Sequence, residues 1–154
     1  MKTTIKTGIT ANITINDDIV TKTVVYNNFS DELLEREEYW LRKLAKYNIS
    51  PKFIARKDNS IIMTYCGEPA TADDFQRQDI QVQLIKILRV LLENHCFYND
   101  FKLSNFTIKE GRLYIIDFGW CPVIKEDYTC GGRVQSNLTR KPYGNVFNLF
   151  NIFK

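Results

Sequence analysis

Apolar and polar residues alternate along the first thirty positions of the chain. Isoleucine and valine recur there among threonine and lysine, a period of two that is typical of half-buried β-strands. The polar run Asn16-Asp17-Asp18 supplies turn-forming side chains between two of the apolar stretches. The pattern predicts strands near 3–8, 11–16 and 18–26 that pair as an antiparallel meander.

A helical pattern follows the predicted meander. Ser30 has the side chain of a helix N-cap, and acidic residues occupy the next turn. Leucine, tryptophan and alanine then recur at helical spacing, which predicts a helix over 31–47. Two further strands are predicted at 52–56 and 60–65, joined by a short polar turn.

The pattern changes in the second half of the chain. The segment Cys66-Gly67-Glu68-Pro69 marks the change, and we interpret it as a hinge. Apolar residues beyond it repeat at helical spacing over 79–94. A tight hairpin with strands at 106–108 and 113–116 comes next.

Composition narrows the possible functions. The 154 residues carry 21 Lys+Arg against 18 Asp+Glu, and a net charge of +3 favours neither nucleic acid nor direct membrane binding. No long apolar run or signal-like start is present, so we expect a soluble, cytoplasmic protein. The four cysteines include no Cys-x-x-Cys pair, which predicts reduced thiols rather than a zinc site. A single histidine gives little support to protease triads.

The strongest candidate site flanks the predicted hairpin. Polar residues cluster on its two sides, in the segments Asn99-Asp100-Phe101-Lys102-Leu103-Ser104-Asn105 and Asp117-Phe118-Gly119. The hairpin brings Asn105 and Asp117 to one edge, where amide and carboxylate oxygens suit Mg²⁺ held together with phosphates. Asp100 is placed to accept a proton from a hydroxyl, and Lys102 to neutralise charge on a transferred phosphoryl group.

These two segments resemble the catalytic and metal-binding motifs of the protein-kinase-like superfamily, Asp-x-Lys-x-x-Asn and Asp-Phe-Gly. The resemblance covers about residues 5–120. It implies an α+β, bilobal fold: a five-stranded antiparallel N-lobe sheet with one helix over 1–66, and a shortened, mainly helical C-lobe over 67–154. It also implies ATP and Mg²⁺ as cofactors, with Asp100 and Lys102 catalytic and Asn105 and Asp117 on the metal.

The first half of the chain offers a separate test of this resemblance. In the family, a lysine of the third strand grips the nucleotide phosphates and a helix glutamate holds it; Lys22 lies in the third apolar run. Glu37 falls between Leu34 and Leu41 in the apolar stripe of the predicted helix. An inward-facing carboxylate is costly unless a cation meets it, so we predict a Lys22–Glu37 pair. The alternative is a Glu37 side chain that turns outward to solvent.

The other nucleotide-binding segments resemble the family less evenly. Gly8 is the only glycine in the stretch that resembles the glycine-rich loop, and Ile13 stands where a valine usually packs on adenine. Nucleotide affinity is therefore expected to be modest. The end of the fifth predicted strand resembles the linker that bonds adenine, with Met63 as gatekeeper and Tyr65 and Cys66 beyond it.

The sequence departs from the family at two places. Asn99 replaces the arginine that usually docks a phosphorylated activation loop, and only 35 residues follow Gly119. This length leaves no room for the helices that build a peptide platform. The chain resembles minimal atypical kinases, such as KEOPS-type and lipopolysaccharide-core kinases. Large DNA viruses also encode compact kinase-like proteins, and an Asn-, Ile- and Lys-rich composition suits such a source.

These observations favour an ATP- and Mg²⁺-dependent phosphotransferase that acts on Ser/Thr hydroxyls of a protein, its own included. A small-molecule or lipid kinase and a catalytically weak, kinase-like interaction module are the alternatives. The apolar tail 146–153 is expected to pack on the helix over 79–94, or else to form a dimer or partner interface. We expect the protein in the cytoplasm, or in the host cytoplasm or virion if it is viral.

Overall fold

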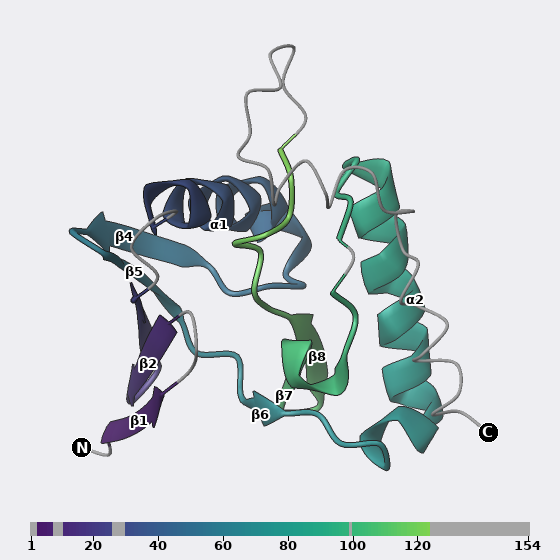
Figure 1. The fold of residues 1–154 in the computed structure, drawn as a ribbon. Coiled ribbons are helices and arrows are strands. Elements are labelled where there is room, and N and C mark those ends of the chain that lie inside the picture. The colour runs from purple at the N-terminus through teal and green to yellow at the C-terminus, as the bar shows by residue number, and fades with distance from the viewer. Residues whose placement is uncertain (1–2, 8–10, 26–29, 99, 124–154) are drawn as a thin grey trace.

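A five-stranded sheet occupies the N-terminal half of the computed structural model, which describes residues 3–7, 11–25, 30–98 and 100–123 (Figure 1). All its neighbouring strands are antiparallel, in the order β1-β2-β3-β5-β4. The strands are β1 (Thr3–Thr7), β2 (Ala11–Asn16), β3 (Ile19–Val24), β4 (Phe53–Lys57) and β5 (Ser60–Thr64). The first three form the meander that the alternating pattern predicts. After β3 the chain passes through a helix to the edge strand β4 and returns as β5, which pairs with β3.

That helix, α1 (Ser30–Leu44), continues into the short 3₁₀ turn η1 (Ala45–Tyr47) and contacts β3, β4 and β5. Acidic residues in its first turn and basic residues in its last complement the helix dipole. It ends where Asn48 takes a left-handed conformation, with φ of 55°, which asparagine tolerates better than most residues. Leu34, Leu41 and Leu44 are buried on the face that meets the rest of the molecule.

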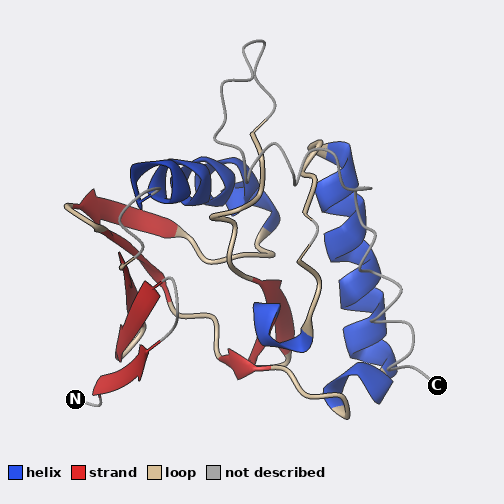
Figure 2. Ribbon diagram, in the orientation of Figure 1, coloured by secondary structure: helices blue, strands red, loops and turns tan. Residues whose placement is uncertain are grey.

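The second half of the described chain combines one long helix with a small sheet (Figure 2). The helix is α2 (Gln78–Glu93), and the sheet has the antiparallel order β6-β7-β8. Its strands are β6 (Glu68–Pro69), β7 (Phe106–Lys109) and β8 (Arg112–Ile115), and two 3₁₀ turns, η2 (Asp74–Gln76) and η3 (Leu103–Asn105), lie in the connections. In Figure 1 this small sheet lies between the five-stranded sheet and α2, which contacts β8.

One hydrophobic core runs through both halves. Buried residues of α1, α2, β5, β7 and β8 belong to a single cluster, with Phe106 and Phe118 among its fully buried members. The amide of Ile115 donates to the carbonyl of Ile49 at 2.8 Å, which ties β8 to the segment after α1. The two sheets are therefore fixed relative to each other.

The five-stranded antiparallel sheet with one helix is confirmed, with boundaries that differ from the prediction by a few residues. Strand β6 was not predicted, because we interpreted its segment as a hinge. A strand of two residues, one of them proline, is too short to show a period, and it exists because it pairs with β7. Gly8, Asn99, Cys130 and the tail 146–153 lie outside the described residues. No helix in the described ranges is long and apolar enough to cross a membrane.

Candidate active site

A cavity of about 450 Å³ lies between the two sheets. This volume is within the range of about 300–1,000 Å³ that is usual for small-molecule sites. Strands β2 and β3 line one side with Ile13, Ile15 and Val20, while Thr107 of β7 lies on the other. Of the polar residues predicted for the site, five line this cavity: Lys22, Glu37, Lys102, Asn105 and Asp117.

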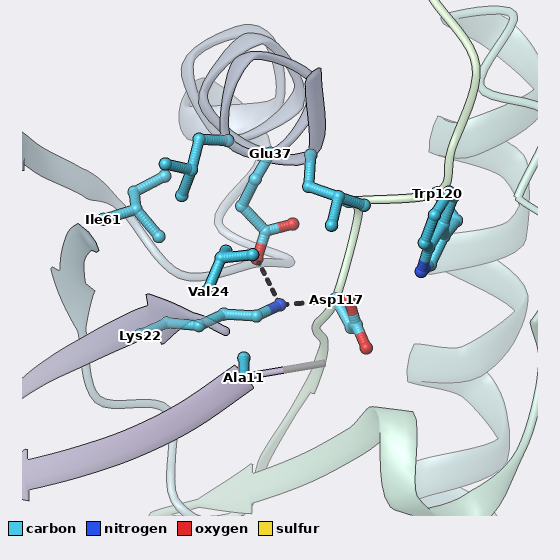
Figure 3. Close-up of a pocket in the computed structure, with 10 residues that line it drawn as sticks. Ala11, Lys22, Val24, Glu37, Ile61, Asp117 and Trp120 are labelled. Atoms are coloured by element: carbon cyan, nitrogen blue, oxygen red, sulfur yellow. Dashed lines mark hydrogen bonds and ion pairs between the residues drawn. The ribbon is translucent and has the colours of Figure 1, made fainter. Parts of the chain in front are cut away.

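Lys22 lies between two carboxylates, and all three side chains line the cavity (Figure 3). Its Nζ donates to Asp117 Oδ1 at 3.1 Å and to Glu37 Oε1 at 3.4 Å. Burial lowers the pKa of Lys22, but the Asp117 and Glu37 carboxylates more than offset this effect and raise the pKa above its usual range. The predicted Lys22–Glu37 pair is present, and Lys22 stays protonated throughout the physiological pH range.

Glu37 is held from a second side. Its Oε2 accepts a hydrogen bond from the backbone amide of Phe118, so the carboxylate links α1 both to β3 and to the Asp-Phe-Gly segment. Burial raises the pKa of Glu37, while Lys22 and the Phe118 amide act in the opposite direction. A small void of about 20 Å³ beside this contact is lined by Leu33, Leu34, Ile61 and Trp120 among others. Figure 3 shows Ile61 and Trp120 on either side of the cluster.

Asp117 has an uncommon backbone conformation. Its φ is 70°, in the left-handed region where a residue other than glycine is strained by about 1 kcal/mol or more. The Lys22 ammonium lowers the pKa of Asp117 against the effect of burial, so the carboxylate is ionised at neutral pH. The side chain remains 40% exposed, which leaves it accessible from the cavity.

The second candidate segment is organised around Asn105. The Nδ2 atom of this buried amide donates to the carbonyl of Asp100 at 2.9 Å and to its Oδ2 at 3.0 Å. Lys102 approaches the same carboxylate, with 3.5 Å between Nζ and Oδ2. The amide of Ile116 donates to the Asn105 carbonyl at 2.9 Å, which joins this segment to the residue before Asp117. The hairpin thus brings Asn105 and Asp117 to one edge, as predicted.

The donor set fits a magnesium ion bound together with phosphate. Asn105 uses its amide nitrogen on Asp100, so its amide oxygen is the atom suited to a metal, and Asn105 and Asp117 both line the cavity. Within the described residues, no group of three or more His, Cys, Asp and Glu side chains could hold a metal alone. Magnesium commonly takes one or two protein oxygens and completes its shell with water and substrate phosphates.

The predicted adenine-binding residues also line the cavity. Met63, Tyr65 and Cys66 line its wall together with the apolar side chain of Ile13. The Tyr65 amide donates to the Asp18 carbonyl at 2.8 Å and its hydroxyl to Glu68 Oε1 at 2.6 Å, which fix this linker. Burial raises the pKa of the Cys66 thiol to about 11.

Sequence reasoning missed three groups that contact the site. Thr107 lines the cavity with a buried hydroxyl that has no hydrogen-bond partner among the described residues. Arg36 and Trp40 bond to main-chain carbonyls just after Asp117. Both lie one turn or less from Glu37 on α1, so the helical spacing 36, 37, 40 was the available signal.

Comparison with known proteins supports the fold and leaves the family open. No profile of a known protein family matches the sequence, and no curated protein matches it. Among solved structures, the chain is similar to one described as WbdD in a co-crystal with the kinase inhibitor LY294002. The TM-score is 0.56 at 15% identity, and the match covers 73% of this chain and 31% of that one, so the chain spans about a third of that protein. The mixed α/β fold built on a five-stranded antiparallel sheet is therefore similar to part of the WbdD fold.

Proposed function

We propose that the chain is an ATP- and Mg²⁺-dependent phosphotransferase that moves the γ-phosphoryl group of ATP to a hydroxyl. The observation that carries the proposal is the Lys22 ammonium, buried between the Glu37 and Asp117 carboxylates in a cavity of nucleotide size. Because such a cluster is costly to bury, its presence in the wall of an open cavity favours a role in binding phosphate. The likeness to a kinase structure supports the same proposal.

In this proposal the cavity divides into an apolar part and a charged part. Ile13, Val20 and Met63 enclose the base, and the main chain near Tyr65 and Cys66 supplies its hydrogen bonds. Lys22 binds the α- and β-phosphates, and Glu37 keeps the ammonium in place. The protonated state of Lys22 suits a polyanionic ligand without any change in pH.

Asn105 and Asp117 would hold Mg²⁺, which neutralises the negative charge of the bridging phosphates when it is bound. Asp100 is half-exposed, so an acceptor hydroxyl can approach it and give up its proton to the carboxylate. Asn105 orients Asp100 through two hydrogen bonds, and Lys102 offsets charge on the phosphoryl oxygens. A Ser or Thr hydroxyl of a protein is the acceptor we propose first.

A paired assay tests the proposal on the full chain. Mg·ATP should raise the melting temperature, since a ligand at 100 times its Kd stabilises the folded state by about 2.7 kcal/mol. Lys22→Met and Asp117→Asn should abolish this rise, whereas Lys86→Met, at an exposed position on α2, should keep it. Asp100→Asn should retain the rise and lose transfer of label from γ-labelled ATP.

The molecule that receives the label distinguishes a protein kinase from a small-molecule or lipid kinase and from an interaction module. Label on the chain itself or on a generic protein acceptor supports a protein kinase, and label only on sugars or lipids supports a small-molecule or lipid kinase. Binding of Mg·ATP without transfer to any acceptor would reject the enzyme and leave a kinase-like interaction module. Absence of both binding and transfer would refute the proposed function altogether.

A further inference from the structure

We propose that Arg36 and Trp40 are positioning residues, which fix the segment 117–121 by holding its main chain against α1. The proposal gives Asp117 the metal-binding role assigned above, and in that respect rests on the proposed function. We call the contacts of Arg36 and Trp40 with this segment the clamp. Whether they hold the segment can be tested without any ligand.

Arg36 makes the most direct of these contacts. Its Nε donates to the carbonyl of Gly119 at 2.6 Å, a short charge-assisted hydrogen bond. The guanidinium carbon also lies 5.6 Å from the centroid of the Trp120 ring, within cation–π range. Arg36 is only 7% exposed, which is unusual for an arginine unless its charge is used inside the molecule.

Trp40 holds the end of the segment. Its indole Nε1 donates to the carbonyl of Cys121 at 3.1 Å, and the residue is 1% exposed. Glu37, which lies between Arg36 and Trp40 on α1, accepts the hydrogen bond from the Phe118 amide at the start of the segment. A Cβ atom on Gly119 would lie 3.3 Å from Leu33 Cδ2, so the main chain passes close to the helix there.

The four α1 residues share one face of the helix. The spacing 33, 36, 37, 40 places successive side chains on one face of neighbouring turns, so they meet the single segment of main chain at 118–121. Three of them contact backbone atoms and none of these contacts depends on the side chains at 118–121. This face of α1 is therefore built to hold a segment in one position.

The other end of the segment is held separately. The Tyr98 hydroxyl donates to the Ile116 carbonyl at 2.7 Å, and the Ile116 amide donates to the Asn105 carbonyl. Asp117 thus lies between one anchor at 116 and another at 118–121. Its positive φ is strained, and contacts on both sides are what keep a strained residue in place.

Loss of the α1 contacts should release Asp117 without removing any group that touches the nucleotide base. We therefore expect Arg36→Met to weaken the Mg²⁺-dependent part of ATP affinity by about tenfold, a typical effect for a residue that orients a metal ligand. Affinity for ATP measured in excess EDTA should stay within about twofold of the wild type. Arg42→Met is the matched control, because Arg42 lies on the exposed side of α1 and stacks on Phe53.

The deciding experiment is hydrogen–deuterium exchange on the full chain without ligand, followed in peptides that cover 117–123. Arg36→Met and Trp40→Phe should each speed exchange there by about tenfold or more, and Arg42→Met should leave it unchanged. Trp40→Phe keeps an aromatic ring at this buried position while it removes the indole N–H together with part of the ring volume, and it carries the test if Arg36→Met does not fold.

The two proposals fail in different ways. Exchange at 117–123 that stays at the wild-type rate in the folded variants would overturn the clamp, whatever the nucleotide data show. Faster exchange in a chain that binds no Mg·ATP would support the clamp as a structural feature and reject the proposed function. Faster exchange with unchanged Mg²⁺-dependent affinity would overturn the positioning role of Arg36.

Discussion

The reactivity of the Cys66 thiol probes the environment of the cavity wall. Its thiol is buried in the cavity wall, and desolvation raises its pKa to about 11. A thiol reacts as its thiolate, so this environment should make Cys66 slow to alkylate at neutral pH. An alkylating reagent and a bound nucleotide would both need the space next to this thiol, so the rate at which Cys66 is alkylated reports nucleotide binding.

We predict that iodoacetamide modifies Cys66 about a hundredfold more slowly at pH 8 than a solvent-exposed thiol, because its pKa is about two units higher. The rate should rise tenfold per pH unit until the pH approaches 11. Saturating Mg·ATP should slow it further. Peptide mass spectrometry separates Cys66 from the other thiols, and Cys66→Ser is the control. Rapid labelling at pH 7, or labelling that Mg·ATP leaves unchanged, would contradict this assignment.

The site was predictable from sequence where a residue carries a local cost. Glu37 was found because a carboxylate within an apolar stripe needs a cation, and Lys22 is that cation. Arg36 lies beside it and was missed, because a long basic side chain at the edge of a stripe usually turns outward. Its partner is the carbonyl of Gly119, a group that every residue has and that no sequence pattern marks.

Helices and strands were likewise predictable from sequence where the signal is local. The strands with several alternating residues and both long helices were predicted from their periods. Strand β6 has two residues and depends on a neighbour far along the chain, so only the tertiary structure defines it. Gly67 is the local feature that makes the pairing possible, since its φ is 94° and its main chain passes against β7.

Gly67→Ala should therefore disrupt the small sheet. An added Cβ would lie 2.0 Å from the carbonyl oxygen of Ile108, so the clash adds to the cost of a left-handed alanine, which is about 1–2 kcal/mol. Gly111→Ala is the matched control, because Gly111 also has a positive φ of 78° but has nothing within 4 Å of the new atom. Urea unfolding should show a small loss for Gly111→Ala and a loss at least twice as large for Gly67→Ala. Equal losses would show that β6 does not approach β7 in this way.

The whole molecule is held by its shared core. Leu41 of α1 and Ile87 of α2 belong to one buried cluster although they come from different halves of the chain. The cavity lies between the two sheets, so its shape depends on their relative position. A continuous core gives the site a rigid frame, and it also makes unfolding a property of the entire described structure.

We predict a single cooperative unfolding transition. In a Trp120→Phe background, which leaves Trp40 as the single tryptophan, the fluorescence of Trp40, buried on α1, and the far-UV circular dichroism of both helices should give the same urea midpoint. Leu41→Ala and Ile87→Ala should each lower the free energy of unfolding by about 2–5 kcal/mol and shift both signals together. Ile85→Ala, at a position that is 66% exposed, should change it little.

If instead Ile87→Ala moved the circular dichroism midpoint and left the Trp40 signal in place, the halves would unfold independently. The cavity between them would then lack the rigid frame that phosphoryl transfer requires, because the reacting groups must be held within a fraction of an ångström.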